Sequence, residues 1–191
     1  GTTDTFTVVL DAQPSSDVVI TLTSSDNGEA TVTSTLTFTS ANWDTAQTAT
    51  VTGVNDNLVD GTITSTLTIA VDDSNSDNDF DSVLDQTISV TTTDDDTAGF
   101  TITQSEGTTG VTESGTTDTF TVVLDTQPTS DVVIIFTSGD TGEATVTSSL
   151  TFTSANWDTA QTVTVTGVDD VAVDGNQTTT ITASIDDSNS D

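Results

Sequence analysis

The sequence predicts an all-β protein built from tandem antiparallel β-sandwich repeats. The first observation is composition, because threonine, valine and isoleucine dominate the 191 residues and favour extended strands. The second is periodicity, since apolar residues and threonines alternate along several segments, as in strands with one buried face. The third is an internal repeat: residues 1–77 align without a gap with residues 115–191, which gives about 114 residues per repeat.

Alternation identifies the strands. It is clearest in residues 31–39, where valine, leucine and phenylalanine face one way and five threonines face the other, and again in residues 63–71. No segment shows the 3.6-residue period of a helix. In chain order the expected strands are 5–10, 18–23, 30–39, 48–54, 63–71 and 87–93 in repeat 1, then 99–103 with a second part near Val111, 119–124, 132–137, 144–153, 162–168 and 178–185 in repeat 2.

Seven short antiparallel strands in a repeat of this length fit an immunoglobulin-like sandwich. We therefore expect two domains, residues 1–96 and residues 97–191. Repeat 1 has no counterpart of residues 98–114, and repeat 2 has no counterpart of residues 78–96. This pattern predicts that the sequence is one part of a longer array of repeats. The alternative is a subunit that is completed by a strand from its neighbour.

The residue types that are absent exclude several functions. The chain has 31 acidic residues, no Lys, Arg or His, and a formal net charge of −31. Without Lys, His, Cys or Tyr, the usual general bases and activated nucleophiles are absent, so we expect no enzyme. Zinc, haem and iron–sulfur sites of the ordinary kinds are excluded as well. The negative charge disfavours nucleic acid as a partner. No apolar run is long enough to predict membrane insertion.

Acidic residues are expected to gather at one end of each domain. In an up-and-down sandwich, alternate strands run the same way and end at the same pole, and acidic residues follow several of these ends. Carboxylates gathered without a basic residue repel one another, and Ca²⁺, which binds six to eight oxygens, would remove that repulsion. The alternative is that Asp and Asn simply suit turns there. The candidate ligands are Asp26, Asn55, Asp56, Asp60, Asp94, Asp95 and Asp96 in repeat 1, and Glu113, Asp140, Asp169, Asp170 and Asp174 in repeat 2.

A second acidic cluster is expected in the loop after residues 63–71 and its equivalent in repeat 2. Its spacing is similar to the start of an EF-hand loop, but it lacks the glycine at the sixth position and the glutamate at the twelfth. It is therefore the weaker calcium candidate, which could border a junction between repeats. Its members are Asp73, Asn75, Asp77, Asp79, Asp187, Asn189 and Asp191.

Several short motifs resemble the Calx-β domain of sodium–calcium exchangers and of long bacterial surface proteins. They are AGFTIT at residues 98–103, VTESG at 111–115, TFTVVLD ahead of a proline, VTGVDD followed by Asp174, and TTTDDD ending at Asp96. The resemblance covers essentially the whole repeat. It implies calcium binding through an early glutamate, two acidic loops and a terminal acidic run. Asn55 departs from the pattern, because the family has an acidic pair there.

These observations favour a structural function. The expected protein is an extender segment of a long secreted or cell-surface fibre or adhesin, rigidified by Ca²⁺. Its partners would be neighbouring repeats of the same chain and, in a fibre, identical chains. One alternative is an adhesive module that binds a glycan or protein through its loops or through Trp43 and Trp157. Another is a calcium sensor similar to the exchanger domains.

Overall fold

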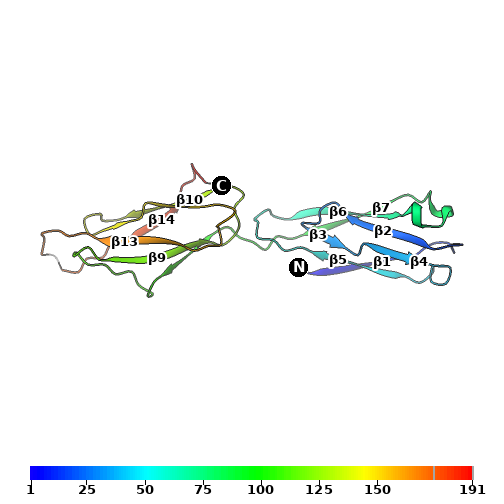
Figure 1. Cartoon of the computed structure of the whole chain (residues 1–191), viewed down its shortest axis with the longest axis horizontal. Coiled ribbons are helices and arrows are strands. Elements are labelled where there is room, and N and C mark those ends of the chain that lie inside the picture. The colour runs from blue at the N-terminus through cyan, green and yellow to red at the C-terminus, as the bar shows by residue number, and fades with distance from the viewer. Residues whose placement is uncertain (174, 191) are drawn as a thin grey trace. The chain divides into compact units, whose positions relative to one another are not determined.

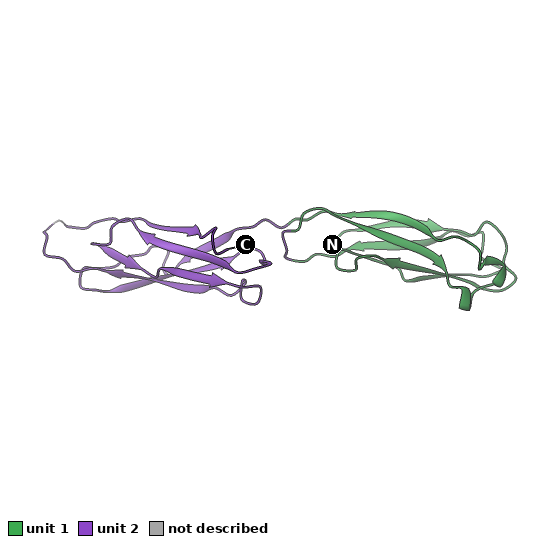
Figure 2. Ribbon diagram, turned by 90° about the horizontal axis from the view of Figure 1, so that it is seen from above, with its two compact units in different colours: residues 1–56, 60–95 green, residues 57–59, 96–191 purple. Residues whose placement is uncertain are grey.

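The computed structural model describes residues 1–173 and 175–190 and is all-β (Figure 1). Its strands form four antiparallel sheets in two compact units, coloured separately in Figure 2. Unit 1 contains Gly1–Asp56 and Asp60–Asp95, and unit 2 contains Asn57–Val59 and Asp96–Asp191. The division along the chain thus lies one residue before the predicted boundary, and three residues of the first repeat belong to unit 2.

Each unit is a sandwich of two sheets. In unit 1 the sheets have the strand orders β1-β5-β3 and β4-β2-β6-β7, and in unit 2 the orders are β11-β13-β9-β8 and β12-β10-β14. The strands of unit 1 are β1 (Thr3–Val8), β2 (Val18–Ser24), β3 (Ala30–Val32), β4 (Thr35–Phe38), β5 (Gln47–Gly53), β6 (Ile63–Val71) and β7 (Gln86–Thr92). Those of unit 2 are β8 (Phe100–Gln104), β9 (Thr117–Leu124), β10 (Val132–Ser138), β11 (Ala144–Val146), β12 (Ser149–Phe152), β13 (Gln161–Gly167) and β14 (Ile181–Ile185).

The two sheets of each unit enclose an apolar core. In unit 1, Phe38 and Val18 are completely buried, and in unit 2 Phe152 is completely buried. Phe120 and Phe136 pack edge to face in unit 2, with ring centroids 5.8 Å apart. The alternation of apolar and threonine residues produces this arrangement, because successive side chains of a strand point to opposite faces of the sheet. The prediction of an all-β sandwich is therefore confirmed.

The helical content among the described residues is two short 3-10 turns, Asp73–Asn75 and Asn78–Phe80. Within those residues, no helix has the length and apolar character needed to cross a membrane.

The prediction of one strand over residues 30–39 was wrong. The segment forms β3, which pairs with β5, and then β4, which pairs with β2 in the other sheet. Thr33 lies at the crossing, where its hydroxyl accepts a hydrogen bond of 2.9 Å from the Thr50 amide. Residues 144–153 are divided in the same way into β11 and β12. The Thr33 hydroxyl thus takes the place of a backbone acceptor in the ladder with β5, which permits the chain to bend from one sheet to the other.

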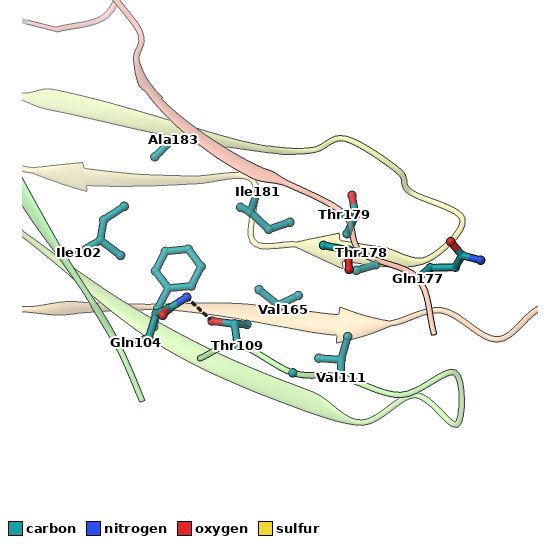
Figure 3. A pocket seen from close by; sticks show the side chains of 13 residues that line it. Ile102, Gln104, Thr109, Val111, Val165, Gln177, Thr178, Thr179, Ile181 and Ala183 are labelled. Atoms are coloured by element: carbon teal, nitrogen blue, oxygen red, sulfur yellow. Dashed lines mark hydrogen bonds between the residues drawn. The ribbon is translucent and has the colours of Figure 1, made fainter. Parts of the chain in front are cut away.

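Two further strand predictions need correction in unit 2. The strand expected over residues 178–185 begins only at Ile181. Its equivalent in unit 1, β6, is longer because its first residues pair with β7, whose counterpart is not among the paired strands of unit 2. No strand forms near Val111, although this side chain packs against the core (Figure 3).

One polar atom in the core of unit 1 predicts a stabilising substitution. Ser65 in β6 is 1% exposed, and its hydroxyl is buried without a hydrogen-bond partner. Removing a buried, unsatisfied hydroxyl gains about 1 kcal/mol, so Ser65→Ala should raise the free energy of unfolding by that amount. Urea unfolding would measure the change. Ser89→Ala, at an exposed position of β7, is the control and should change stability by less than about 0.5 kcal/mol. A destabilised Ser65→Ala variant would contradict the prediction.

Candidate functional site

Three acidic side chains meet at one end of unit 1. Glu29 directly precedes β3, Asp56 follows β5, and Asp60 precedes β6. Each offers a carboxylate oxygen, and these oxygens all lie within 4.8 Å of one another. The loops are held together there, because the Val54 amide donates a 2.8 Å hydrogen bond to the Glu29 carbonyl. We call Glu29, Asp56 and Asp60 the acidic triad.

Asp94, at the end of β7, joins the same end of unit 1. Its Oδ2 accepts hydrogen bonds from the backbone amides of Asp60, at 3.1 Å, and Gly61, at 2.9 Å. Gly61 has a φ of +77°, a conformation that glycine adopts without steric cost. The Asp94 carboxylate thus fixes the backbone of the loop that carries Asp60.

The three carboxylates of the acidic triad repel one another when they are all charged. Partial burial raises the pKa of Glu29 above its ordinary value, and the nearby charges of Asp60, Asp56 and Asp26 raise it further. The chain contains no Lys, Arg or His side chain that could neutralise these charges. Oxygen-rich, negatively charged sites of this kind suit hard divalent cations. The triad is therefore a group that could bind a metal ion.

The equivalent end of unit 2 has a related arrangement. Glu143 occupies the position of Glu29, and its carbonyl accepts a 2.9 Å hydrogen bond from the Val168 amide. Glu143 and Glu113 line one depression together with the loop that precedes β14. Asp174 lies outside the described residues. Among the described residues of unit 2, no three acidic side chains approach one another as the triad of unit 1 does.

The structure uses other predicted ligands in turns. Asp26 and Asp140 each accept a 2.9 Å hydrogen bond from the glycine amide two residues further on. Asp170 accepts one of 2.8 Å from the Ala172 amide. Asn55 donates one of 3.0 Å to the Asp56 carbonyl. Asp95 and Asp169 are exposed, and Asp96 belongs to unit 2. Apart from Asp56, none of these residues is part of the acidic triad.

Sequence reasoning missed Glu29 and Glu143. Both follow a turn and directly precede the alanine that begins a strand, in the motifs NGEA and TGEA. The signal that identifies them is the repetition of this glutamate in both repeats, next to a loop of the predicted acidic pole. Asp26 and Asp140 are the predicted ligands from that loop, whereas in unit 1 the structure places Glu29 with Asp56 and Asp60.

In the second acidic cluster, the side chain of Asp77 accepts hydrogen bonds from backbone amides. Asp77 is buried, and its Oδ2 accepts bonds from the Ser15 amide at 2.6 Å and the Ser16 amide at 2.9 Å. Its Oδ1 accepts a 3.1 Å bond from the Asp79 amide. Both oxygens therefore already have protein partners. Among the described residues, the members of this cluster do not form a group comparable to the triad.

A repeated motif stabilises the same loop in both units. Asn75 donates a 2.9 Å hydrogen bond to Asp72, and Asn189 donates one of 2.8 Å to Asp186. Ser76 and Ser190 bond in turn to the backbone of the neighbouring strands, at Val19 and Val133. Asp73 and Asp187 are exposed, and Asp191 lies outside the described residues. The motif DDSNSD thus has a structural use in the loop.

Asp77→Asn should make unit 1 less stable at neutral pH and less sensitive to acid. Hydrogen bonds from Ser16, Asp79 and Ser15 lower the pKa of Asp77 from 3.8 to about 2. A carboxylate with a lowered pKa stabilises the folded state above its unfolded pKa, and this contribution disappears as the pH falls from about 4 to about 2. We expect the wild type to lose its advantage over Asp77→Asn in that interval, as measured by thermal unfolding. Exposed Asp73→Asn is the control, and equal effects of both substitutions would contradict the prediction.

The two tryptophans are half-buried in equivalent loops. Trp157 packs against the core of unit 2, and the carbonyl of Trp43 accepts a 3.2 Å hydrogen bond from the Leu10 amide. Both residues thus contribute to the ends of the sandwiches.

No protein-family model matches this sequence, and no curated protein matches it.

Proposed function

We propose that this chain is an extender segment of a secreted or cell-surface fibre or adhesin, whose repeats bind Ca²⁺ at their acidic poles and become rigid when they do. The observation that carries the proposal is the acidic triad. Its three carboxylates lie within 4.8 Å of one another in a chain without a single basic side chain. Such a cluster costs free energy until a cation joins it.

Calcium is the cation that this ligand set suits best. It accepts six to eight oxygen ligands from carboxylates, carbonyls and amides in a flexible geometry, whereas Mg²⁺ demands a nearly ideal octahedron. The triad and the neighbouring Asp94 are all oxygen donors on three different loops. A bound ion would therefore connect the loops that follow β2, β5 and β7. The resemblance to Calx-β domains, carried by the motifs of both repeats, supports the same ion.

The repetition supports a structural function in preference to a unique binding site or a catalytic one. Two units of the same kind follow each other in one chain, and neighbouring repeats are the partners we propose. We place the protein outside the cell, where calcium is plentiful enough to occupy sites of modest affinity. No enzymatic activity is proposed.

Calorimetric titration of the EDTA-treated chain with CaCl₂ tests whether the chain binds calcium. We expect saturable binding that Asp60→Asn weakens by about tenfold or more, because it removes a charged ligand from the triad. Asp44→Asn, an exposed acidic residue in the loop between β4 and β5, is the matched control and should bind as the wild type does. Binding that is absent, or that both variants reduce equally, would overturn the calcium proposal.

Small-angle X-ray scattering of the full chain tests whether calcium makes the chain rigid. We expect the scattering curve in calcium to fit a narrower distribution of chain conformations than the curve in EGTA. The Asp60→Asn variant should lose part of this difference. Identical scattering in both conditions, with calcium shown to be bound, would leave a calcium-binding domain that is not rigidified by the ion and would exclude the extender mechanism.

A further inference from the structure

The turn between β2 and β3 presents an asparagine with an unbound side chain. Asn27 is exposed in this turn and is followed directly by Gly28. Within the described part of the chain, no residue forms a hydrogen bond with the Asn27 carboxamide. The side chain can therefore rotate toward the backbone that follows it, where the glycine has no side chain to hinder an approach.

The other asparagines differ from Asn27 in the residue that follows them. Each of them precedes a residue with a side chain, and after Asn75 and Asn189 that residue is a serine. The carboxamides of these two asparagines are also held in place, because they donate hydrogen bonds of 2.9 Å and 2.8 Å to Asp72 and Asp186. Asn27 thus combines an unhindered neighbour with an unbound side chain.

The internal repeat supplies the same turn without the asparagine. In both units the aspartate that opens the turn accepts a backbone hydrogen bond from the alanine four residues further on, at 3.0 Å in unit 1 and 3.1 Å in unit 2. Its carboxylate accepts a 2.9 Å bond from the glycine amide in either unit. Thr141 of unit 2 stands at the position of Asn27 and is also exposed. The two turns are therefore matched except at this residue and its surroundings.

One contact of the turn must break before the Gly28 nitrogen can react. The amide hydrogen of Gly28 is bound by the Asp26 carboxylate, at a nitrogen–oxygen distance of 2.9 Å. Asp26, Asn27 and Gly28 are all exposed. Solvent-exposed hydrogen bonds of a surface turn open locally at a small cost in free energy. We therefore expect the turn to open while unit 1 stays folded.

We propose that Asn27 is a site of spontaneous deamidation, with the backbone nitrogen of Gly28 as the nucleophile. A base from solvent removes the hydrogen of this nitrogen, which bonds to Cγ of Asn27 and closes a cyclic imide. The side-chain nitrogen of Asn27 takes a proton from water and leaves as ammonia. One water molecule then opens the imide at either carbonyl, so that aspartate or isoaspartate stands at this position. No enzyme is needed, because the attacking group is held in the same chain beside its target.

The reaction adds a negative charge next to the acidic triad. The new carboxylate follows Asp26 and precedes Glu29 by two residues, and the charge of Asp26 already raises the pKa of Glu29. Deamidation therefore increases the repulsion at this end of unit 1. An effect of the new charge on calcium binding would rest on the proposed function, whereas the deamidation itself does not.

Incubation of the full chain at mildly alkaline pH tests the site. The buffer contains EGTA, so that the result does not depend on calcium. Samples are digested with pepsin at acid pH, where the reaction is slow, and the loss of amide is followed by mass spectrometry of the peptides. The peptide with Asn27 should lose its amide at least about tenfold faster than those with Asn75 or Asn189. Labelling with an isoaspartyl methyltransferase should detect isoaspartate, which direct hydrolysis of the carboxamide would not produce.

Two variants test whether the asparagine–glycine pair in this turn is necessary and sufficient. Gly28→Ala should slow the reaction at Asn27 by about tenfold or more, because a methyl group then hinders the attacking nitrogen. The added Cβ would lie 3.1 Å from Oδ1 of Asp26, an exposed side chain that can move aside. Thr141→Asn creates the same pair in unit 2 and should react at a rate within about threefold of that at Asn27.

The outcomes separate the proposal from its alternatives. Selective reaction at Asn27, its loss in Gly28→Ala and its appearance in Thr141→Asn would support the site. Equal rates at Asn27 and Asn75 would overturn it, as would a Thr141→Asn chain that stays intact. Reaction of the chain in urea but not in buffer would also overturn it, since the folded turn would then protect the asparagine.

Discussion

Without divalent ions, a Glu29→Gln variant is expected to melt at a higher temperature than the wild type, and in millimolar calcium the order is expected to reverse. Partial burial and the charges of Asp60, Asp56 and Asp26 disfavour the ionised form of Glu29 in the folded state. Glutamine keeps the shape and removes the charge, so metal-free unit 1 should gain a few degrees. The same change removes a carboxylate from the acidic triad.

Ligand linkage sets the size of the effect in calcium. An ion at about 100 times its dissociation constant should raise the melting temperature of a unit of this size by about 10 °C or more. We expect the wild type to show this rise and Glu29→Gln to lose most of it. Each unit contains one tryptophan, so a Trp157→Phe background lets Trp43 fluorescence report unit 1 alone.

The control for this prediction is Glu106→Gln. Glu106 is exposed in the loop after β8 and belongs to unit 2, so its substitution should leave both melting temperatures of unit 1 unchanged. A Glu29→Gln variant that melts lower than the wild type in EGTA would contradict the repulsion argument. A full calcium response of that variant would contradict the assignment of Glu29 as a ligand.

Phe120→Ala is expected to destabilise unit 2 by about 3–5 kcal/mol, the cost of removing a buried phenylalanine from a packed core. Phe120 is 6% exposed and packs edge to face on Phe136. Its equivalent in unit 1, Phe6, is half-buried on an edge strand, and the position of Phe136 is taken by Leu22. Phe6→Ala should therefore cost clearly less, about 1–3 kcal/mol.

Urea unfolding measures both costs within one chain. Trp157 fluorescence in a Trp43→Phe background reports unit 2, and Trp43 fluorescence in a Trp157→Phe background reports unit 1. The comparison is matched, because the same substitution is made at the same position of two similar sequences. Equal costs in the two units would show that the neighbouring strand β8 contributes nothing to the burial of this phenylalanine.

Most of the fold could be predicted because it depends on local alternation. Apolar residues and threonines alternate along β5 and along most of β6, and one buried face follows directly from that pattern. The crossing at Thr33 could not be predicted in this way. The threonines continue at every second position through residues 31–39, so their pattern does not show that the chain leaves one sheet there. The pairing of β3 with β5 and of β4 with β2 does.

Part of the acidic triad could be predicted from the sequence. Asp56 and Asp60 are among the predicted ligands, because strand direction fixes which strand ends meet, whereas Glu29 is not among them. Which carboxylates converge depends on loop geometry, such as the turn at Gly61 and the position of Glu29 beside β3. Asp77 illustrates the same limit, since its acidic spacing indicated a ligand while its partners are the amides of a distant loop.

The passage of one segment through both sheets has a mechanical consequence. Residues 30–38 contribute β3 to one layer of unit 1 and β4 to the other, and residues 144–152 do the same in unit 2. A tensile force that separates the layers must therefore stretch this crossing segment and break hydrogen bonds in both ladders together. Each domain should yield to tension in a single all-or-none step, so that stretching a series of such domains would give a sawtooth force curve with one peak per repeat.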